Sequence, residues 1–431
     1  MVVNSMSYAK YERYKDSGVD WLGAIPSDWQ SKKLGILLTE FSKKNNPNLP
    51  LLSITRELGV ITRDMDDQES NHNFIPDDLS GYKLLKEGQF GMNKMKAWQG
   101  SYGISKYTGI VSPAYYVFDV SNEIYPNFFN IAIRSKFYVD FFGSASDGVR
   151  IGQWDLNKTR MREIPFIFPS LEQQKKIYEF LSKKIKQIDQ AISLKQQQIE
   201  KLNEYKQIVI QNAVTKGLNP NAPMKNSGVD WIGDIPEHWQ MKRLKYVLDE
   251  RNERSKTGEE PLFMVSQKYG LVVRADYHEK AEVAQSNIDN KIVYKNDLVF
   301  NKLKPHLGVF YKSEIDFKGL VSPDYAVYKV KNYIYDMKYL EILFRNPKYI
   351  EQFIIRATGI VEGLIRLYTT SLFELPVMIP PKEEQEAILK FVKIENDKID
   401  ISQQNVEKQI DRLKEYKNIL INQAVTGKIK I

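Results

Sequence analysis

The stretch DSGVDWLGAIPSDWQSKKLGILLTE at residues 16–40 decides the fold, because NSGVDWIGDIPEHWQMKRLKYVLDE repeats it at residues 226–250. The second copy starts 210 positions after the first, which is close to half of the 431-residue chain. A repeat of that length has the size of a domain and is too long for a solenoid unit. The sequence therefore predicts two copies of one module, related by an approximate twofold axis.

The repeat continues through the rest of each half. GIVSPAYYV at 109–117 returns as GLVSPDYAV at 319–327, NKMK at 93–96 as NKLK at 301–304, and LNEYKQIVIQNAVT at 202–215 as LKEYKNILINQAVT at 413–426. In contrast, SITRELGVITRDMDDQESNHNF at 53–74 has only a loose counterpart in VSQKYGLVVRADYHEK at 265–280. The scaffold is repeated, and these middle stretches are not.

The composition fits two globular domains. Hydrophobic residues make up 42% of the chain and aromatic residues 12%, which is enough to fill a core in each half. No apolar run approaches the ~18 residues of a membrane span, and residues 1–10 lack the apolar core of a signal peptide, so we expect a cytoplasmic protein. The absence of cysteine excludes disulfides, thiolate catalysis and cysteine zinc sites. The four histidines have no metal-ligand spacing.

The net charge of +8 hints at a polyanionic partner. That hint is weak by itself, but the basic residues gather at corresponding points of the two halves. Examples are Lys94 and Lys96 in the first half, and Lys302 and Lys304 in the second.

Each half ends in a segment whose apolar residues recur at intervals of three, four or seven. Such a pattern over several heptads predicts a long helix in a coiled coil. Because a solitary helix would expose its apolar stripe, we expect the two helices to pair, and the twofold relation makes the pair antiparallel. The predicted seam residues are Leu181, Ile185, Ile188, Ile192, Ile199, Leu202 and Val209 in the first helix, and Val392, Ile399, Val406, Ile410, Leu413 and Leu420 in the second. Polar seam residues would fix the register at some cost in stability; they are Lys195, Lys206, Asn396, Gln403 and Lys417.

Both helices have recognisable starts. Ser170 followed by Gln173 has the spacing of a capping box, and proline at 380–381 opens the second helix. We therefore predict a domain at 1–170, a central long helix at 171–217, a second domain at 218–381 and a C-terminal long helix at 382–431. A helix of this size is roughly 65 Å long and can hold two domains well apart.

The segments between the helices have a mixed α/β pattern. β-branched and aromatic runs at 110–120, 291–300 and 320–330 predict strands, and helical spacing at 128–142 and 339–355 predicts one helix per domain. The predicted fold class is a tandem repeat of α/β (α+β) domains, separated by two long antiparallel coiled-coil helices with pseudo-twofold symmetry.

Several blocks together resemble the specificity subunit of type I restriction-modification systems. They are YKDSGVDWLGAIPSDW (14–29), MNKMKAWQGS (92–101), GIVSPAY (109–115) and FPSLEQQKKI (168–177), with their copies in the second half. The resemblance covers almost the whole chain, and the blocks keep the order of that family. It implies two target-recognition domains that each read one half of a split site in double-stranded DNA, with the helices setting the gap.

The resemblance also implies partners. Two methyltransferase (modification) subunits would dock on the helices, and restriction (motor-nuclease) subunits would lie outside them. S-adenosylmethionine, ATP and Mg²⁺ are then expected on those partners only, with no cofactor and no catalytic residue on this chain.

Candidate DNA contacts follow Phe90, at an expected loop. They are Asn93, Lys94, Lys96, Trp98, Gln99 and Ser101, and their counterparts in the second half are Asn301, Lys302, Lys304 and His306. Lysine can contact phosphates or guanine, and asparagine or glutamine can pair with adenine. Because these residues recur, a role in the shared fold explains them equally well. Shared residues do not explain two different half-sites, so phosphate contacts suit them better than base contacts.

Base-reading residues are instead expected in the divergent stretches. Arg56 and Arg63 are the candidates in the first half, and Lys268 and Arg274 in the second. Arg150 lies in a glycine-flanked loop with no charged counterpart, so a role for its charge would be specific to the first half.

Four repeated tryptophans suggest a structural role. Trp21, Trp29, Trp231 and Trp239 accompany a repeated proline in each copy of the opening motif. We interpret this block as packing each domain onto the base of its helix.

Two other classes of function remain as alternatives. An independent enzyme is disfavoured, because the chain lacks a GxxxxGK[ST] phosphate loop and a glycine-rich S-adenosylmethionine loop after a strand. A coiled-coil adaptor without DNA binding would explain the helices but not the repeated basic segments. Salt-dependent DNA binding separates the adaptor from the recognition subunit.

Overall fold

A computed structural model describes residues 8–19, 22–64, 75–148, 154–266, 269–277, 286–359 and 365–431. The chain divides into two compact units, one formed by residues 1–196 with 407–431 and the other by residues 197–406. Each unit holds one α/β domain and parts of both long helices. Among the described residues, no helix is both long enough and apolar enough to cross a membrane.

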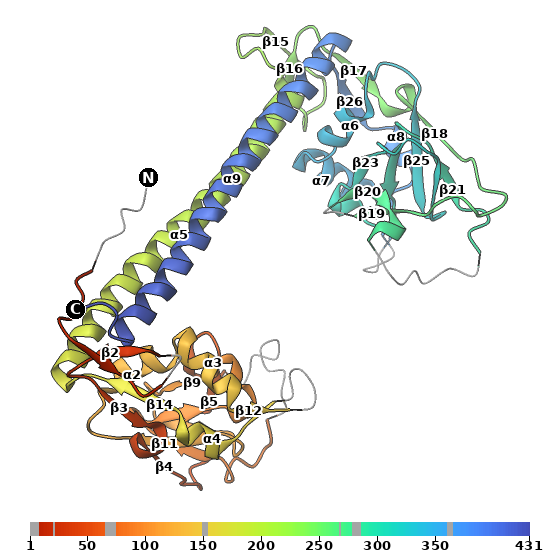
Figure 1. Cartoon of the computed structure of the whole chain (residues 1–431). Coiled ribbons are helices and arrows are strands. Elements are labelled where there is room, and N and C mark those ends of the chain that lie inside the picture. Colours follow the sequence, from red (N-terminus) through yellow and green to blue (C-terminus); the bar gives the residue numbers. More distant parts are fainter. Residues whose placement is uncertain are drawn as a thin grey trace. The chain divides into compact units, whose positions relative to one another are not determined.

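The first unit contains the elements from β1 to the start of the first long helix (Figure 1). Its strands are β1 (Tyr14–Asp16), β2 (Ala24–Pro26), β3 (Gln30–Lys33), β4 (Leu38–Glu40), β5 (Leu52–Thr55), β6 (Gly59–Thr62), β7 (Lys83–Leu85), β8 (Phe90–Met92), β9 (Tyr102–Ile104), β10 (Gly109–Val111), β11 (Tyr116–Val120), β12 (Ser146–Asp147), β13 (Asp155–Leu156) and β14 (Pro165–Phe168). Its helices are α1 (Leu34–Leu37), the 3₁₀ helix η1 (Lys94–Gln99), α2 (Pro126–Ile133), α3 (Lys136–Ser144), α4 (Lys158–Glu163) and the long helix α5 (Leu171–Lys216), which continues into the second unit.

The second unit repeats most of these elements. Its strands are β15 (Met224–Asn226), β16 (Asp234–Pro236), β17 (Gln240–Arg243), β18 (Leu248–Glu250), β19 (Phe263–Ser266), β20 (Gly270–Val273), β21 (Lys291–Val293), β22 (Leu298–Asn301), β23 (Phe310–Lys312), β24 (Gly319–Val321), β25 (Tyr325–Val330) and β26 (Pro376–Ile379). Its helices are the 3₁₀ turns η2 (Leu244–Tyr246), η3 (Arg274–Asp276) and η4 (Pro305–Leu307), with α6 (Met337–Leu343), α7 (Pro347–Arg356), α8 (Thr369–Phe373) and the long helix α9 (Lys382–Val425), which ends in the first unit.

The sheets of the two units have the same topology. A four-stranded antiparallel sheet has the order β4-β11-β8-β9 in the first unit and β18-β25-β22-β23 in the second. Beside it, each unit has the hairpin β5–β6 or β19–β20, and the pair β3–β14 or β17–β26. Helix α2 packs on β9, as α6 packs on β23. The predicted tandem repeat of α/β domains is therefore confirmed.

The predicted strands were too long. The run at 110–120 is divided between β10 and β11, which pair with different strands, and the run at 320–330 is divided in the same way between β24 and β25. The interruption is a turn at the Ser-Pro dipeptide, where Tyr115 N–H donates to Ser112 O and Tyr325 N–H donates to Ser322 O, both at 3.0 Å. Proline has no N–H to give to a ladder, so the chain turns there. The run at 291–300 breaks at Asn296, whose φ is +68°.

The prediction of one helix per domain at 128–142 and 339–355 was also wrong. Each segment forms two helices, α2 with α3 and α6 with α7. Asn346 Oδ1 caps α7 by accepting from Lys348 N–H at 2.9 Å, and Pro347 occupies its first turn. Ser135 has extended backbone between α2 and α3. The apolar spacing persists across these breaks because both helices face one core.

The two long helices pack together in an antiparallel coiled coil, as predicted. In the second unit, Gln403 Nε2 donates to Asn203 Oδ1 and Lys206 Nζ to Asp400 Oδ1, both at 2.7 Å. In the first unit, Lys417 Nζ lies 2.7 Å from Asp189 Oδ1. Within the second unit, residue numbers rise along α5 as they fall along α9, which defines the antiparallel sense.

Each long helix starts at a buried glutamine that ties it to its domain. Ser170 Oγ accepts from Gln173 N–H at 3.4 Å, which confirms the predicted cap. The next residue, Gln174, is fully buried and bonds three backbone groups of the domain. Gln385 repeats this arrangement at the start of α9.

The core of each unit includes residues of both long helices. In the first unit, Trp29 is fully buried in a cluster that contains Leu181 of α5 and Leu420 of α9. A Cβ on Gly427, just after α9, would lie 3.5 Å from the Trp29 ring, and one on Gly217, just after α5, would lie 3.4 Å from Trp239. These two tryptophans therefore pack at the helix ends, as we interpreted them.

The other two tryptophans differ. Trp231 makes an edge contact with Tyr349 of α7, with ring centroids 4.9 Å apart, so it packs on a domain helix. Trp21 lies outside the described residues.

Candidate nucleic-acid interface

The segment from Asn93 to Ser101 forms η1 where a loop was expected. Asn93 Oδ1 caps η1 by accepting from Met95 N–H at 3.2 Å, and its N–H donates to Ser101 O at 3.0 Å. Asn93 and Ser101 are only 4% and 2% exposed. Their burial favours the structural reading of these two residues over direct contact with DNA, because neither side chain reaches the surface.

The residues between them have mixed surroundings. Lys94 Nζ lies 2.7 Å from Asp155 Oδ2, and this hydrogen bond raises the pKa of Lys94. Lys96 is exposed, and Gln99 is half-buried. The Trp98 ring packs on Trp154, with centroids 5.1 Å apart. Lys96 is therefore the residue of this block best placed to contact a ligand.

The corresponding block of the second unit contains η4. Asn301 Oδ1 accepts from Leu303 N–H at 3.0 Å, so Asn301 shapes the turn as Asn93 does. Lys302 is half-buried, whereas Lys304 and His306 are exposed. The repeated asparagines thus serve the shared fold, and the exposed basic side chains beside them remain candidate DNA contacts.

Sequence reasoning missed a lysine on β7. Lys83 Nζ donates to Tyr115 O at 2.7 Å and lies 5.9 Å from the centre of the Tyr116 ring. Lys158 lies over the same ring at 5.3 Å. Burial lowers the pKa of Lys83; the neighbouring charges of Lys44, Lys158 and Lys94 also lower it, and Glu40 opposes them. Four lysines therefore gather at one place, with a tyrosine among them.

The second unit has a lysine at the same place. Lys291 on β21 is 3% exposed, and its Nζ lies 3.2 Å from Glu250 Oε1. Burial lowers the pKa of Lys302, with a further contribution from the charge of Lys291. Lys83 and Lys291 are separated by the same interval as Lys94 and Lys302. That shared interval was the signal available in the sequence.

The described parts of the divergent stretches contribute to the hairpins β5–β6 and β19–β20. Arg56 lies in the turn of β5–β6 and is exposed, and Arg63 follows β6 and is half-buried. Arg274 begins η3 directly after β20 and is half-buried. Arg150 and Lys268 lie outside the described residues. Each hairpin therefore brings at least one arginine to the part of its domain that differs from the other.

The seam residues of the long helices are buried or half-buried. The fully or nearly buried ones are Leu181, Ile188, Val392, Ile399, Val406, Ile410 and Leu420. Those with intermediate exposure are Ile185, Ile192, Ile199, Leu202, Val209 and Leu413.

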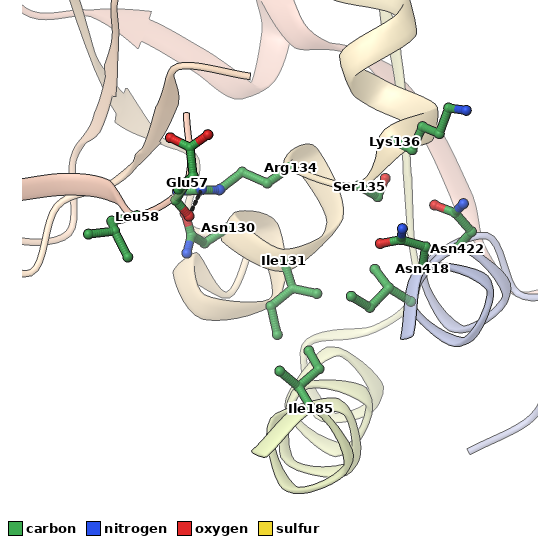
Figure 2. Close-up of a pocket in the computed structure, with 11 residues that line it drawn as sticks. Glu57, Leu58, Asn130, Ile131, Arg134, Ser135, Lys136, Ile185, Asn418 and Asn422 are labelled. Atoms are coloured by element: carbon green, nitrogen blue, oxygen red, sulfur yellow. Dashed lines mark hydrogen bonds between the residues drawn. The ribbon is translucent and has the colours of Figure 1, made fainter. Parts of the chain in front are cut away.

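A cleft of about 370 Å³ lies in the first unit between the domain and the long helices (Figure 2). The turn of hairpin β5–β6 contributes Glu57, the α2–α3 junction contributes Arg134 and Lys136, and the long helices contribute Ile185 and Asn418. The hairpin turn and the helix pair thus border one cavity. In the described residues, no three histidine, aspartate or glutamate side chains gather in a way that could hold a metal ion.

A cleft of about 470 Å³ lies in the second unit between α6 and the long helices. It is lined by charges of both signs, among them Asp336, Lys338, Lys393 and Asp397. Both clefts border a domain helix and the long helices, but among the described residues none from hairpin β19–β20 lines the second cleft.

These features define a class of protein: two α/β domains of one topology, each with neighbouring lysines and a hairpin of divergent sequence, built on a shared pair of antiparallel helices. The profile of the family described as "Type I restriction modification DNA specificity domain" (Methylase_S) matches residues 26–204 and 236–412. The chain belongs to this family, and the resemblance drawn from the sequence blocks is confirmed.

Similar proteins agree with this assignment over the full chain. The type I restriction enzyme MjaVIII specificity subunit of Methanocaldococcus jannaschii is 23% identical over 446 residues, which cover 99% of this chain and 98% of that protein. The putative type I restriction enzyme MjaX specificity subunit of the same organism is also 23% identical, over 455 residues and 99% of both chains.

Two solved structures share the fold. A chain from work described as "Structural basis underlying complex assembly and conformational transition of the type I R-M system" has a TM-score of 0.65 at 14% identity, covering 93% of this chain and 98% of its own. The HsdS subunit of Thermoanaerobacter tengcongensis has a TM-score of 0.53 at 14% identity, covering 94% and 98%. At such low identity the likeness concerns the fold alone.

Proposed function

We propose that this chain is the DNA-recognition subunit of a type I restriction-modification complex, and that each domain reads one half of a bipartite, asymmetric site. The observation that carries this proposal is that the frame and the hairpins recur in topology, while the sequences of the hairpins β5–β6 and β19–β20 differ. Frames of the same sheet topology would present their surfaces in equivalent ways, so differences between the hairpins would translate into different half-sites. Membership of a DNA specificity family supports the same conclusion.

The repeated lysines and the arginines of the divergent stretches would have different roles in DNA binding. Phosphate contacts fix register and orientation, and contacts to base edges carry sequence information. The half-buried lysines Lys94 and Lys302 recur at equivalent places of the two units, which suits the phosphate backbone common to all DNA. Lys83 is also half-buried, whereas its counterpart Lys291 is buried against Glu250 and would support the site from below. Arg56 lies in the turn of hairpin β5–β6, and Arg274 directly follows hairpin β19–β20. These positions suit base reading by arginine, for example through a bidentate contact with guanine.

The long helices would set the spacer between the half-sites. Helix α5 has 46 residues and is therefore roughly 70 Å long. Half-sites on one face of B-DNA lie about 34–36 Å or a multiple of this distance apart. Insertion of one heptad within 185–209 and one in the matching stretch of α9 should change the spacer and leave both half-sites unchanged. An unaltered spacer in such a variant would contradict this role.

The helices would also carry the partner subunits. Large apolar side chains are exposed on them, including Leu194, Tyr205 and Ile208 of α5 and Ile394 and Ile401 of α9. Exposed apolar residues concentrated on one structural element suit a protein interface. We assign this surface to two methyltransferase subunits, with restriction subunits outside them. Methylation and cleavage, with S-adenosylmethionine, ATP and Mg²⁺, would then belong to those partners, and this chain would be non-catalytic.

Methylation mapping of a strain that carries the complex tests the proposal. The expected result is one bipartite motif with two unlike halves and a fixed gap, and it should disappear when this chain is deleted. An assembled complex that methylates without sequence preference would refute the recognition role. A coiled-coil adaptor would show no DNA binding, whereas the proposed subunit should bind with an affinity that falls steeply as salt rises.

A further inference from the structure

Arg134, at the end of α2, holds the turn of hairpin β5–β6 by its backbone. Its Nη2 donates to the carbonyl oxygens of Arg56 and Glu57, both at 2.8 Å. Figure 2 shows the guanidinium reaching from the helix to Glu57. Because both acceptors are main-chain atoms, this anchor is independent of the side chains that the hairpin carries.

Two glycines leave room for the guanidinium. A Cβ on Gly59 of β6 would lie 2.1 Å from Arg134 Nη1, and one on Gly103 of β9 would lie 3.4 Å from the same atom. Gly59 also has a φ of +73°, which disfavours other residues. From the same helix, Asn130 Oδ1 accepts from Ile104 N–H of β9 at 2.9 Å. Helix α2 thus fixes the hairpin and its neighbouring strand together.

The environment makes the contact specific to arginine. Arg134 is half-buried, and burial is the main cause of its lowered pKa. The planar guanidinium presents several donors in a fixed arrangement, whereas a lysine presents a single ammonium at the end of a flexible chain. Two carbonyl oxygens of adjacent residues therefore match arginine better than lysine.

The second unit supports its hairpin with an arginine at the corresponding place. Arg345 directly precedes Asn346, the cap of α7, as Arg134 directly precedes Ser135, the cap of α3. The Arg345 guanidinium lies over the Tyr311 ring at 5.1 Å and pairs with Glu341 at 2.8 Å.

Tyr311 occupies the register position that glycine occupies in the first unit. Tyr311 pairs with Val299 between β22 and β23, as Gly103 pairs with Gly91 between β8 and β9. A Cβ on Gly270 of β20 would lie 3.5 Å from the Tyr311 ring. The tyrosine therefore fills the space next to the hairpin, and Arg345 supports that hairpin through the ring.

We propose that Arg134 and Arg345 are positioning residues for base recognition, each fixing the hairpin of its own domain and thereby the sequence preference at one half-site. Arg134 acts by direct hydrogen bonds to the hairpin backbone, and Arg345 acts through Tyr311. This inference rests on the proposed function, in which the hairpins β5–β6 and β19–β20 read bases.

The test uses the full chain assembled with its cognate modification subunits. Methylation is measured on two pools of DNA duplexes, in which one half-site is randomised while the other is held fixed. R134M should reduce the discrimination between bases roughly tenfold at one half-site only. A displaced hairpin would weaken the contacts of its own arginine with bases, and one such contact contributes about that much discrimination. R345M should reduce discrimination at the other half-site. R134K should behave like R134M, since it keeps the charge without the paired donors.

K136M is the matched control, because Lys136 is an exposed cation two residues away in the same cleft. It should leave both preferences unchanged. If R134M does not assemble, R134K keeps the charge and a side chain of similar length, and it should give the same one-sided loss.

Equal losses at both half-sites, or no loss at either in R134M and R345M, would overturn the positioning role. The wild-type complex distinguishes a failure of the positioning role from a failure of the proposed recognition function. If the wild type discriminates and the variants do not differ from it, only the positioning role fails. If the wild type discriminates at neither half-site, the recognition function fails with it.

Discussion

Replacing Gln174 by leucine should loosen the first unit and leave the second unchanged. The Gln174 side chain is fully buried at the start of α5. Its Oε1 accepts from Tyr125 N–H at 2.7 Å, and its Nε2 donates to the carbonyls of Glu123 and Pro169, each at 2.9 Å. Leucine has a similar size but no polar atom, so three backbone groups would lose their partner together.

The expected cost follows from these three bonds. Each intramolecular hydrogen bond contributes about 1 kcal/mol net, so their loss amounts to about 3 kcal/mol. Tenfold in an equilibrium constant corresponds to about 1.4 kcal/mol, so local opening should become roughly a hundredfold more frequent. Additional apolar burial by leucine would offset only part of this effect.

Hydrogen exchange of the intact chain measures the change where it occurs. Protection of the Tyr125 amide and of its neighbours should fall in Q174L, while peptides around Tyr335 should keep their protection. Q385L is the matched variant, because Gln385 Oε1 accepts from Tyr335 N–H at 3.0 Å and its Nε2 donates to Tyr333 O and Pro380 O at 2.9 Å. It should give the reverse pattern. A change of less than threefold, or equal changes in both units, would refute the reasoning.

Three further outcomes follow from other parts of the chain. K83M/K94M removes two cations expected to contact phosphates, so the slope of log K for DNA binding against log salt concentration should become shallower by about two. An unchanged slope in a filter-binding titration would show that these lysines do not contact phosphates. Burial lowers the pKa of Lys83 in the free protein, and a bound phosphate would raise it. DNA affinity should therefore be constant below the pKa that Lys83 has in the free protein, and it should fall as the pH rises through that pKa. K83R, which stays charged, should abolish that fall, and a persistent fall would exclude Lys83 as its cause. G427A should destabilise the first unit by about 1–3 kcal/mol, because φ is +70° and a Cβ would lie 2.4 Å from Pro26 Cδ; wild-type melting would contradict this contact.

The sequence was sufficient for the architecture because the deciding signals are periodic. A repeat and a heptad pattern each extend over many residues, so local exceptions such as Lys206 in the seam do not obscure them. Strand and helix boundaries depend on single residues, and there the apolar pattern misled. At Pro113 and Asn346 the chain turns while the apolar spacing continues, since the segments on both sides pack into the same core.

The candidate interface was harder to read from the sequence, because burial depends on tertiary packing. Asn93 has the chemistry of an adenine contact, yet its side chain caps η1 beneath the surface. Lys83 and Lys291 occupy strands that otherwise read as apolar, and only the packing around them gathers cations there. Arg134 gave no local signal, because its partners are the main-chain carbonyls of residues about 80 positions earlier.

The way the long helices are shared between the units has a consequence for synthesis. The second unit is a single continuous segment, Gln197–Val406, whereas the first needs Glu407–Ile431 to complete its core. Trp29 packs with Leu420, Ala424 and Val425, which leave the ribosome almost 400 residues after it. Domains generally fold as units during translation, so the part of the chain made first should be the last to become native. Until then its unfinished core is exposed, and a newly made chain depends on the segment Glu407–Ile431 to cover it.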